Sequence, residues 1–225
     1  MLLGIVVSLC FWARLAKRDS RLMFIYAAAL VGAFTGAKLV YIFAEGWRDF
    51  QSDEMWLRLA TGKSILGALL GGYASVEMAK KAFGYKGVTG DWFATIVPLS
   101  IMVGRVGCIV HGCCLGRACD DSWFTLRGPD GLPRWPAAAI EFIFNALMIG
   151  VLFALRRAGK LKGQHFHLYL IAYGVFRFFH EFARETPLLW GGISGYQMAA
   201  IAVAGLGTVG FLKRRQALVT VQAGV

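Results

Sequence analysis

Charged residues are scarce in this 225-residue chain. Aspartate, glutamate, lysine and arginine make up 16% of the sequence, whereas hydrophobic residues make up 57% and the mean hydropathy is +0.58. About a quarter of the residues in soluble domains are charged, so this composition excludes an ordinary soluble protein. Low-complexity tracts and long linkers are also missing, and we therefore expect a single integral membrane domain over residues 1–225.

Positive charge is missing ahead of the first apolar segment. Residues 1–9 carry no charged side chain, and the first basic cluster follows at residues 14–21. A cleaved signal peptide has its positive charges before its apolar stretch. The observed order therefore favours a first span that is retained in the protein.

Apolar residues gather in blocks about as long as the ~20 residues that cross a bilayer as a helix. The sequence therefore predicts an all-α, polytopic membrane protein with seven transmembrane helices. These helices are expected at residues 1–16, 22–44, 64–79, 92–115, 136–155, 164–183 and 194–212.

Basic residues alternate between the connecting segments. The segments after the first, third and fifth blocks and the C-terminal tail are basic, whereas the other three are balanced or slightly acidic. Lysine and arginine favour the cytoplasmic side of short loops, which predicts an outside N-terminus and a cytoplasmic C-terminus. Because this pattern accounts for the net charge of +11, we expect no nucleic-acid partner.

Residues 104–117, GRVGCIVHGCCLGR, are the chemically densest segment of the chain. Arg105 falls inside the fourth expected span, and Arg177 falls inside the sixth, which runs in the same direction. Ionisable residues within a membrane mark functional sites by default, and guanidinium groups bind phosphate through paired hydrogen bonds. Because two facing arginines repel each other, we infer an anionic lipid head group between them.

A structural role is the alternative for these arginines. Glu181 lies one turn after Arg177 and can neutralise it, while Arg105 can pair with a backbone carbonyl. Lys38, beside Tyr41 in the second expected span, is a further candidate for contact with the head group.

Several segments resemble, in the right order, those of the prolipoprotein diacylglyceryl transferase family. The most specific is GRVG at residues 104–107, followed by LGR at 115–117. The resemblance covers about residues 22–212. The other matching segments are GAKLVY at 36–41, LPRWP at 132–136 with Glu141, YGVFR at 173–177 with EFAR at 181–184, and GIS at 192–194 with Gln197.

The resemblance implies an enzyme of the bacterial inner (cytoplasmic) membrane that needs no cofactor and no metal. Such enzymes move the diacylglyceryl group of phosphatidylglycerol onto the cysteine thiol of a lipobox-containing prolipoprotein and release glycerol phosphate. Arginines that hold the phosphate would stabilise charge on the leaving group.

The resemblance also assigns roles to individual residues. Arg105 and Arg177 would bind or polarise the lipid phosphate, Tyr173 would bond to the head group, and Glu181 would fix Arg177. The remaining expected substrate-binding residues are Lys38, Tyr41, Arg117 and Arg184.

The chain departs from the family at several polar positions. Leu66 stands where the family has a histidine, and Cys108, His111 and Cys113 replace two asparagines and a glutamate. A cysteine near a histidine and arginines is a nucleophile, so we expect catalytic roles for Cys108 and Cys113, with His111 as a base. A divergent relative would use these residues to pass a lipid-derived group to another acceptor.

Other interpretations of the cysteines stay open. Cys108, His111, Cys113 and Cys119 are a zinc candidate, although clean metal-binding pairs are missing. A disulfide from Cys113 or Cys114 to Cys119 suits an oxidising compartment, and simple packing is the third alternative. A non-catalytic membrane protein that binds lipid or metal would also be consistent with this sequence.

Overall fold

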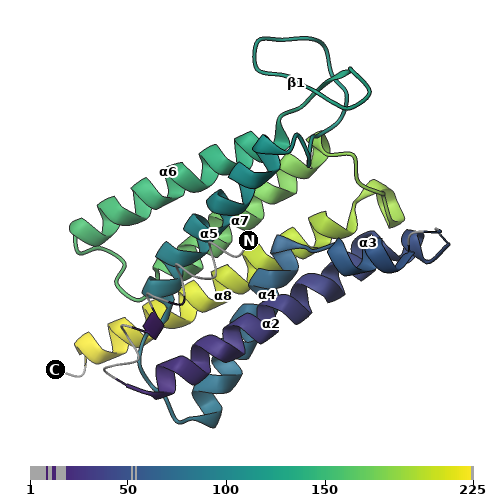
Figure 1. Cartoon of the computed structure of the whole chain (residues 1–225). Coiled ribbons are helices and arrows are strands. Elements are labelled where there is room, and N and C mark those ends of the chain that lie inside the picture. Colours follow the sequence, from purple (N-terminus) through teal and green to yellow (C-terminus); the bar gives the residue numbers. More distant parts are fainter. Residues whose placement is uncertain (1–8, 10–11, 14–18, 52, 54, 224–225) are drawn as a thin grey trace.

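The computed structural model describes residues 9, 12–13, 19–51, 53 and 55–223. Its long helices run in roughly the same slanted direction (Figure 1). They are α2 (Arg21–Ala44), α4 (Ile65–Ala82), α5 (Gly90–Val110), α6 (Ala137–Arg157), α7 (His165–His180) and α8 (Gly195–Ala223). The short elements are η1 (Gly46–Gln51), α3 (Met55–Thr61), β1 (Leu126–Arg127), β2 (Pro133–Arg134), η2 (Glu181–Ala183) and η3 (Trp190–Gly192).

The prediction of a helical protein is confirmed. Each expected span from residue 22 onward coincides with a long helix, whereas the first, at 1–16, lies almost entirely outside the described residues. Within the described part of the chain, four helices are long and apolar enough to cross a membrane. They are α2, α5, α6 and residues Gly195–Gln216 of α8.

Helices α2 and α4 pack with their backbones in contact. A Cβ built on Gly36 would lie 2.3 Å from the carbonyl oxygen of Gly67, and one built on Gly71 would lie 2.2 Å from that of Gly32. On each helix the two glycines are four residues apart, so they share one face. Such small-residue pairs allow helices to approach closely in lipid, where packing replaces the hydrophobic effect as the driving force.

The core lies where α4, α7 and α8 meet. Leu66, Tyr169, Tyr173 and Val203 are at most 1% exposed there. Large apolar side chains also cover the outer faces of α2 and α6, as Phe34 and Leu147 illustrate. An apolar exterior of this extent suits contact with lipid.

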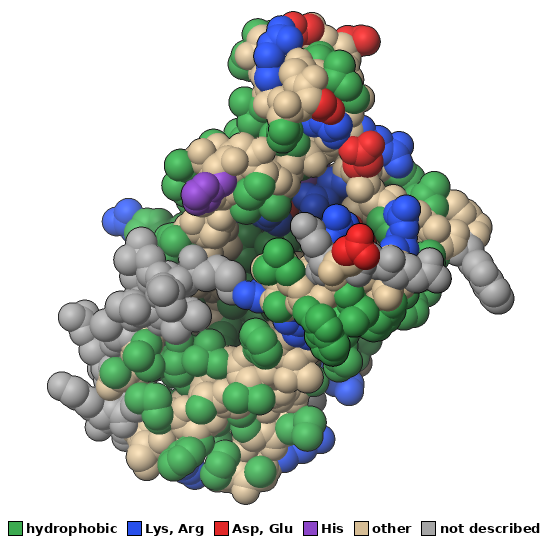
Figure 2. All heavy atoms as spheres, turned by 45° about the vertical axis from the view of Figure 1, so that its right-hand side comes forward, with side chains coloured by type: hydrophobic (Ala, Val, Ile, Leu, Met, Phe, Trp, Pro, Cys, Tyr) green, Lys and Arg blue, Asp and Glu red, His purple; other side chains and the backbone are tan. Residues whose placement is uncertain are grey.

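A short hairpin projects beyond the helices between α5 and α6 (Figure 1). Its strands β1 and β2 pair antiparallel. Arg134 at the base of the hairpin forms ion pairs with Asp130 (2.6 Å) and Glu185 (2.8 Å). Acidic side chains on the face shown in Figure 2 gather in the half that carries this hairpin.

Helix α5 ends at Val110, although its span was expected to continue to residue 115. Gly112 has a φ of +63°, and its N–H donates to the carbonyl oxygen of Ile109 (3.2 Å). The N–H of Cys113 donates to the carbonyl oxygen of Cys108 (3.0 Å). These two bonds form a Schellman motif, which stops the helix and turns the chain. The apolar residues beyond Val110 did not indicate that the helix ends there.

Candidate active site

A carboxylate lies between Arg105 of α5 and Arg177 of α7, the two arginines expected within the membrane. Glu141 of α6 is 0% exposed, and its Oε2 lies 2.8 Å from Nη2 of Arg105 and 3.6 Å from Nη1 of Arg177. Glu141 thus supplies a negative charge between the arginines, which reduces the repulsion from which a lipid head group between them was inferred. Binding of a head group at this cluster stays a prediction.

Two hydrogen-bonded side-chain pairs between α6 and α7 hold Glu141 in place. The hydroxyl of Tyr173 donates to Oε1 of Glu141 (2.8 Å), and that of Tyr169 donates to Oδ1 of Asn145 (2.7 Å). The amide of Asn145 also donates to the backbone carbonyl of Glu141 (2.8 Å). Because residues four apart share one face of a helix, two such pairs on antiparallel helices fix the carboxylate in place.

A second carboxylate binds two arginines. Oε2 of Glu181 lies 2.8 Å from Nη2 of Arg177 and 3.7 Å from Nε of Arg184. Nη1 of Arg177 also donates to Nδ1 of His180 (3.2 Å). Both the functional role and the structural alternative expected the Arg177–Glu181 pair, so the role of Glu181 at the site stays a prediction.

The arginine cluster, defined as Arg105, Arg177, Arg184, Glu141 and Glu181, has one positive charge in excess. Nε of Arg105 and both Nε and Nη1 of Arg184 are buried without a hydrogen-bond partner among the described residues. Buried donors normally find an acceptor, and arginine favours anionic oxygens. The cluster thus has the charge and the donors that one small anion requires.

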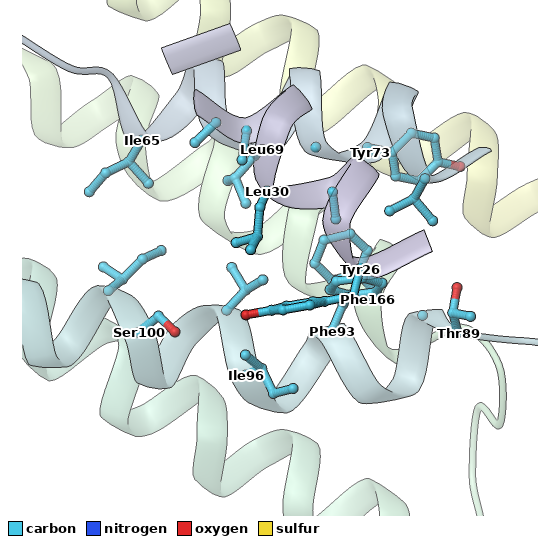
Figure 3. A pocket seen from close by; sticks show the side chains of 18 of the residues that line it. Tyr26, Leu30, Ile65, Leu69, Tyr73, Thr89, Phe93, Ile96, Ser100 and Phe166 are labelled. Carbon is cyan, nitrogen blue, oxygen red and sulfur yellow. The ribbon is translucent and has the colours of Figure 1, made fainter. Parts of the chain in front are cut away.

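An apolar cavity of about 460 Å³ ends beside this cluster. Figure 3 shows Tyr26, Phe93 and Phe166 reaching into it from α2, α5 and α7. Its lining follows α5 from Gly90 to Cys108 and includes Arg105, a length of about 27 Å at 1.5 Å per helical residue. The lining is mostly apolar but also includes the charged residues Glu77, Lys80 and Arg214. An apolar space with cationic side chains on its lining suits an amphiphile with an anionic head.

Three thiols gather at the same end of α5. The Sγ atoms of Cys108, Cys113 and Cys114 all lie within 4.8 Å of one another, and Sγ of Cys108 is 3.8 Å from Nη1 of Arg105. All three and Cys119 are free thiols, so the alternative of a disulfide to Cys119 is not what the structure shows. Cys113 and Cys114 are exposed as residues, but their sulfurs are partly shielded from water by the neighbouring thiols. The pKa of Cys114 is raised by a hydrogen bond with Cys108 and by this partial desolvation. Partial desolvation is also the main cause of a raised pKa at Cys113.

The next residues expected at the site are Arg117, His111 and the position of the missing family histidine. Arg117 is exposed, and its Nε donates to the carbonyl oxygen of Arg184 (2.9 Å). His111 caps the C-terminus of α5 with an exposed side chain that makes no hydrogen bond to the described residues. Leu66, at the position of the family histidine, is 1% exposed in the apolar core.

Lys38 and Tyr41 have partners elsewhere. The ammonium of Lys38 donates to the carbonyl oxygens of Leu59 (2.5 Å), Ala60 (2.6 Å) and Gly62 (2.8 Å), where it caps the C-terminus of α3. The hydroxyl of Tyr41 donates to Oδ2 of Asp49 (2.5 Å). Neither side chain bonds to the arginine cluster, and their contact with substrate stays a prediction.

Sequence reasoning assigned no role to two residues that the structure makes central. Glu141 was noted only as part of a matching segment, although a glutamate inside an apolar span is itself a signal of function. Cys114 was considered only as a disulfide partner. Its place beside Cys108 depends on the turn that follows α5.

The sequence is similar to those of one family of known proteins. The sequence model of the family described as prolipoprotein diacylglyceryl transferase matches residues 1–213. A phosphatidylglycerol–prolipoprotein diacylglyceryl transferase of Pseudoalteromonas atlantica is 32% identical over 160 residues, which are 69% of this chain and 57% of that protein. The enzyme of the same name from Clostridium tetani is 30% identical over 164 residues, 70% of this chain and 66% of the relative.

A third relative shows the same partial coverage. The enzyme from Mannheimia succiniciproducens is 28% identical over 183 residues, which are 75% of this chain and 65% of its own length. The chain therefore spans less than two thirds of the length of each of these three relatives.

Proposed function

Because this chain belongs to the prolipoprotein diacylglyceryl transferase family, we propose that it transfers the diacylglyceryl group of phosphatidylglycerol to the cysteine thiol of a prolipoprotein. One observation carries the proposal. The buried arginine cluster has one positive charge in excess and stands at the end of an apolar cavity. The acyl chains would occupy the cavity, and the phosphate would bind the unpartnered donors of Arg105 and Arg184.

The reaction exchanges one bond for another. The acceptor sulfur attacks the glyceryl carbon that carries the phosphate, a carbon–sulfur bond forms, and the carbon–oxygen bond to the phosphate breaks. The electron pair of that bond stays on the phosphate oxygen of the departing glycerol phosphate. Arg105 and Arg184 stabilise this charge through their unpartnered donors and Arg177 through its nearby positive charge, and preorganised donors of this kind contribute about 10²–10³-fold in rate.

The proton of the acceptor thiol needs a base. His111 lies three residues beyond Cys108, at the end of α5 that carries Arg105, and its exposed imidazole is free of hydrogen bonds to the described residues. An acceptor that approaches from this end reaches it first. The apolar Leu66 offers no such group.

The topology belongs to the same proposal. Seven spans with an outside N-terminus place the hairpin and the arginine end of the cavity outside the cytoplasmic membrane of a bacterium. The support is the alternation of basic segments together with the apolar outer faces of α2 and α6.

The test uses labelled phosphatidylglycerol and a lipobox peptide with purified protein. We expect transfer to fall at least ~100-fold in Arg105→Ala and Arg177→Ala, and comparably in Arg105→Lys, which keeps the charge opposite Glu141 but loses the paired donors. Arg127→Ala is the matched control, since Arg127 bonds to Asp121 on the exposed hairpin. Full transfer by both alanine variants would rule out the proposed site.

A second candidate function is transfer to one of the chain's own thiols. The contact between Cys108 and Arg105 favours it, because it places a nucleophile beside the phosphate site. Intact-protein mass spectrometry in the same reaction separates the two functions. A diacylglyceryl mass on the protein without modified peptide would select this second candidate.

A further inference from the structure

The end of α5 brings two cysteines together by a defined backbone motif. In a Schellman motif the residue two positions beyond the helix cap returns to the last turn, where its side chain commonly meets that of the third residue from the end. Here those two residues are Cys113 and Cys108, which share the hydrogen bond from the Cys113 N–H to the Cys108 carbonyl. The usual apolar contact of this motif is replaced by a pair of thiols.

Cys114 joins the pair through an unusual backbone conformation. Its φ is +59°, in the left-handed region that residues other than glycine seldom adopt. The chain thus turns left-handed at Gly112 and again at Cys114, and the third thiol lies against the first two. The three Sγ atoms are within 4.8 Å of one another.

This spacing matches a metal site with three sulfur ligands. A metal–sulfur bond of about 2.3 Å places three trigonal sulfurs about 4 Å apart. A disulfide would use only two of the thiols and leave the third unpaired. The mutual approach of all three therefore favours a shared ligand over a bond between two of them.

The ligand set selects the kind of metal. Thiolates prefer soft ions such as Cu(I) and Zn²⁺, and structural Zn²⁺ is almost always bound by four ligands. Among the described residues, no histidine, aspartate or glutamate joins the three cysteines in this group. Three sulfurs alone suit trigonal Cu(I).

The surroundings of the thiols fit a bound thiolate cluster. Each thiol loses its proton when it binds a metal, so three thiolates and one Cu(I) carry two negative charges. Arg105, 3.8 Å from Cys108, offsets part of this charge. Cys113 and Cys114 are exposed and provide a way in.

We propose that Cys108, Cys113 and Cys114 form a binding site for one Cu(I) ion at the end of α5, where Cys108 also lines the apolar cavity. The site goes beyond the proposed transfer to a prolipoprotein, because no step of that reaction involves the metal. It excludes the second candidate function while the metal is bound, because Cys108 would then be a ligand instead of a free thiol. Its ligands are three thiolates from the last turn of α5 and the turn that follows it.

The experiment is a competition for Cu(I) under argon. The full-length protein in detergent is reduced, freed of reductant and titrated against the coloured complex of Cu(I) with bicinchoninate. We expect the protein to withdraw one Cu(I) per chain, and X-ray absorption at the copper edge to count three sulfur neighbours. Zn²⁺ at equal concentration should leave the Cu(I) in place.

Single substitutions test the ligands. Cys108→Ser, Cys113→Ser and Cys114→Ser should each weaken Cu(I) binding at least ~100-fold, because serine is a poor ligand for a soft ion. Cys119→Ser is the matched control and should bind as the original chain does, since Cys119 lies outside the group.

Three results would overturn the proposal. The first is that the reduced protein withdraws no Cu(I) from the bicinchoninate complex. This holds also if its thiols form a disulfide in air, because a disulfide without Cu(I) binding would show that the cysteines pair with each other. Another is unchanged binding by Cys114→Ser. The third is a preference for Zn²⁺ over Cu(I), which would call for a fourth ligand.

Discussion

At the scale of single residues, Glu141 explains how two arginines share the interior of this protein. Its carboxylate pairs with Arg105 and Arg177, and Tyr173 holds it in place. Breaking a buried ion pair by removing one partner leaves an uncompensated charge, at a cost of about 3–5 kcal/mol. We therefore expect Glu141→Gln to lower the free energy of unfolding in detergent by about that amount.

The control for this prediction is a glutamate with an exposed arginine pair. Glu185 pairs with Arg134 at the base of the hairpin, and its side chain is 70% exposed. Glu185→Gln should change the free energy of unfolding by at most ~0.5 kcal/mol. Equal stability of the two variants would show that Glu141 does not neutralise the arginines.

The thiols of the turn after α5 give a prediction for pH dependence. The pKa values of Cys113 and Cys114 are raised, so less thiolate is present at a given pH than in a free thiol. Because the thiolate is the reactive form, alkylation of both by iodoacetamide should be slow at pH 7–8 and should still rise above pH 9. Mass spectrometry of the labelled peptides gives the rates, with N-acetylcysteine as the reference. If the alkylation rates of Cys113 and Cys114 level off at the same pH as that of N-acetylcysteine, their pKa values are not raised.

The sequence could identify the arginines but not their partner. Arg105 and Arg177 stand out because charge is rare in apolar spans, and Glu181 follows Arg177 by one helical turn. Glu141 is far from both in sequence, so its place between them depends on how α5, α6 and α7 pack. Local periodicity contains no information on that packing.

At the scale of elements, the close crossing of α2 and α4 depends on glycines, which carry only a hydrogen atom where other residues carry a side chain. Gly36→Leu should force the two helices apart, and overpacking of this kind lowers stability by about 1–3 kcal/mol. Unfolding in detergent measures the effect. Gly150→Leu is the matched control, because nothing lies within 4 Å of a Cβ at that position of α6. A similar loss in both variants would mean that the crossing is not tight.

Helices were easier to predict than their ends. Long apolar blocks located α2, α4, α5, α6, α7 and α8, because a block of about 20 apolar residues favours one long helix. Helix α5 ends five residues before the predicted end of the fourth span, since the cysteines and the leucine among residues 111–115 are apolar enough to extend the block. The left-handed turn at Gly112 ends α5, and only the backbone reveals it.

At the scale of the whole molecule, the proposed topology places the hairpin and the loop after α6 on opposite sides of the membrane. Trp123, three residues before β1 of the hairpin, is 96% exposed, and Lys160 in the loop is also exposed. In a chain whose own cysteines are changed to serine, Trp123→Cys should react with a membrane-impermeant maleimide in cells with a permeabilised outer membrane. Lys160→Cys should react only after the inner membrane is disrupted. The opposite pattern would reverse the topology.

The single excess charge of the arginine cluster sets a direction for the proposed reaction. The phosphodiester of the lipid carries one negative charge, which balances the cluster. After transfer the phosphate is a monoester with a charge of about −1.5 to −2 near neutral pH, and the cluster becomes overcompensated. The product would then be repelled by the same carboxylates that hold the arginines together, and water outside would receive it. Glu141 and Glu181 would in this way favour release of the spent head group over its return.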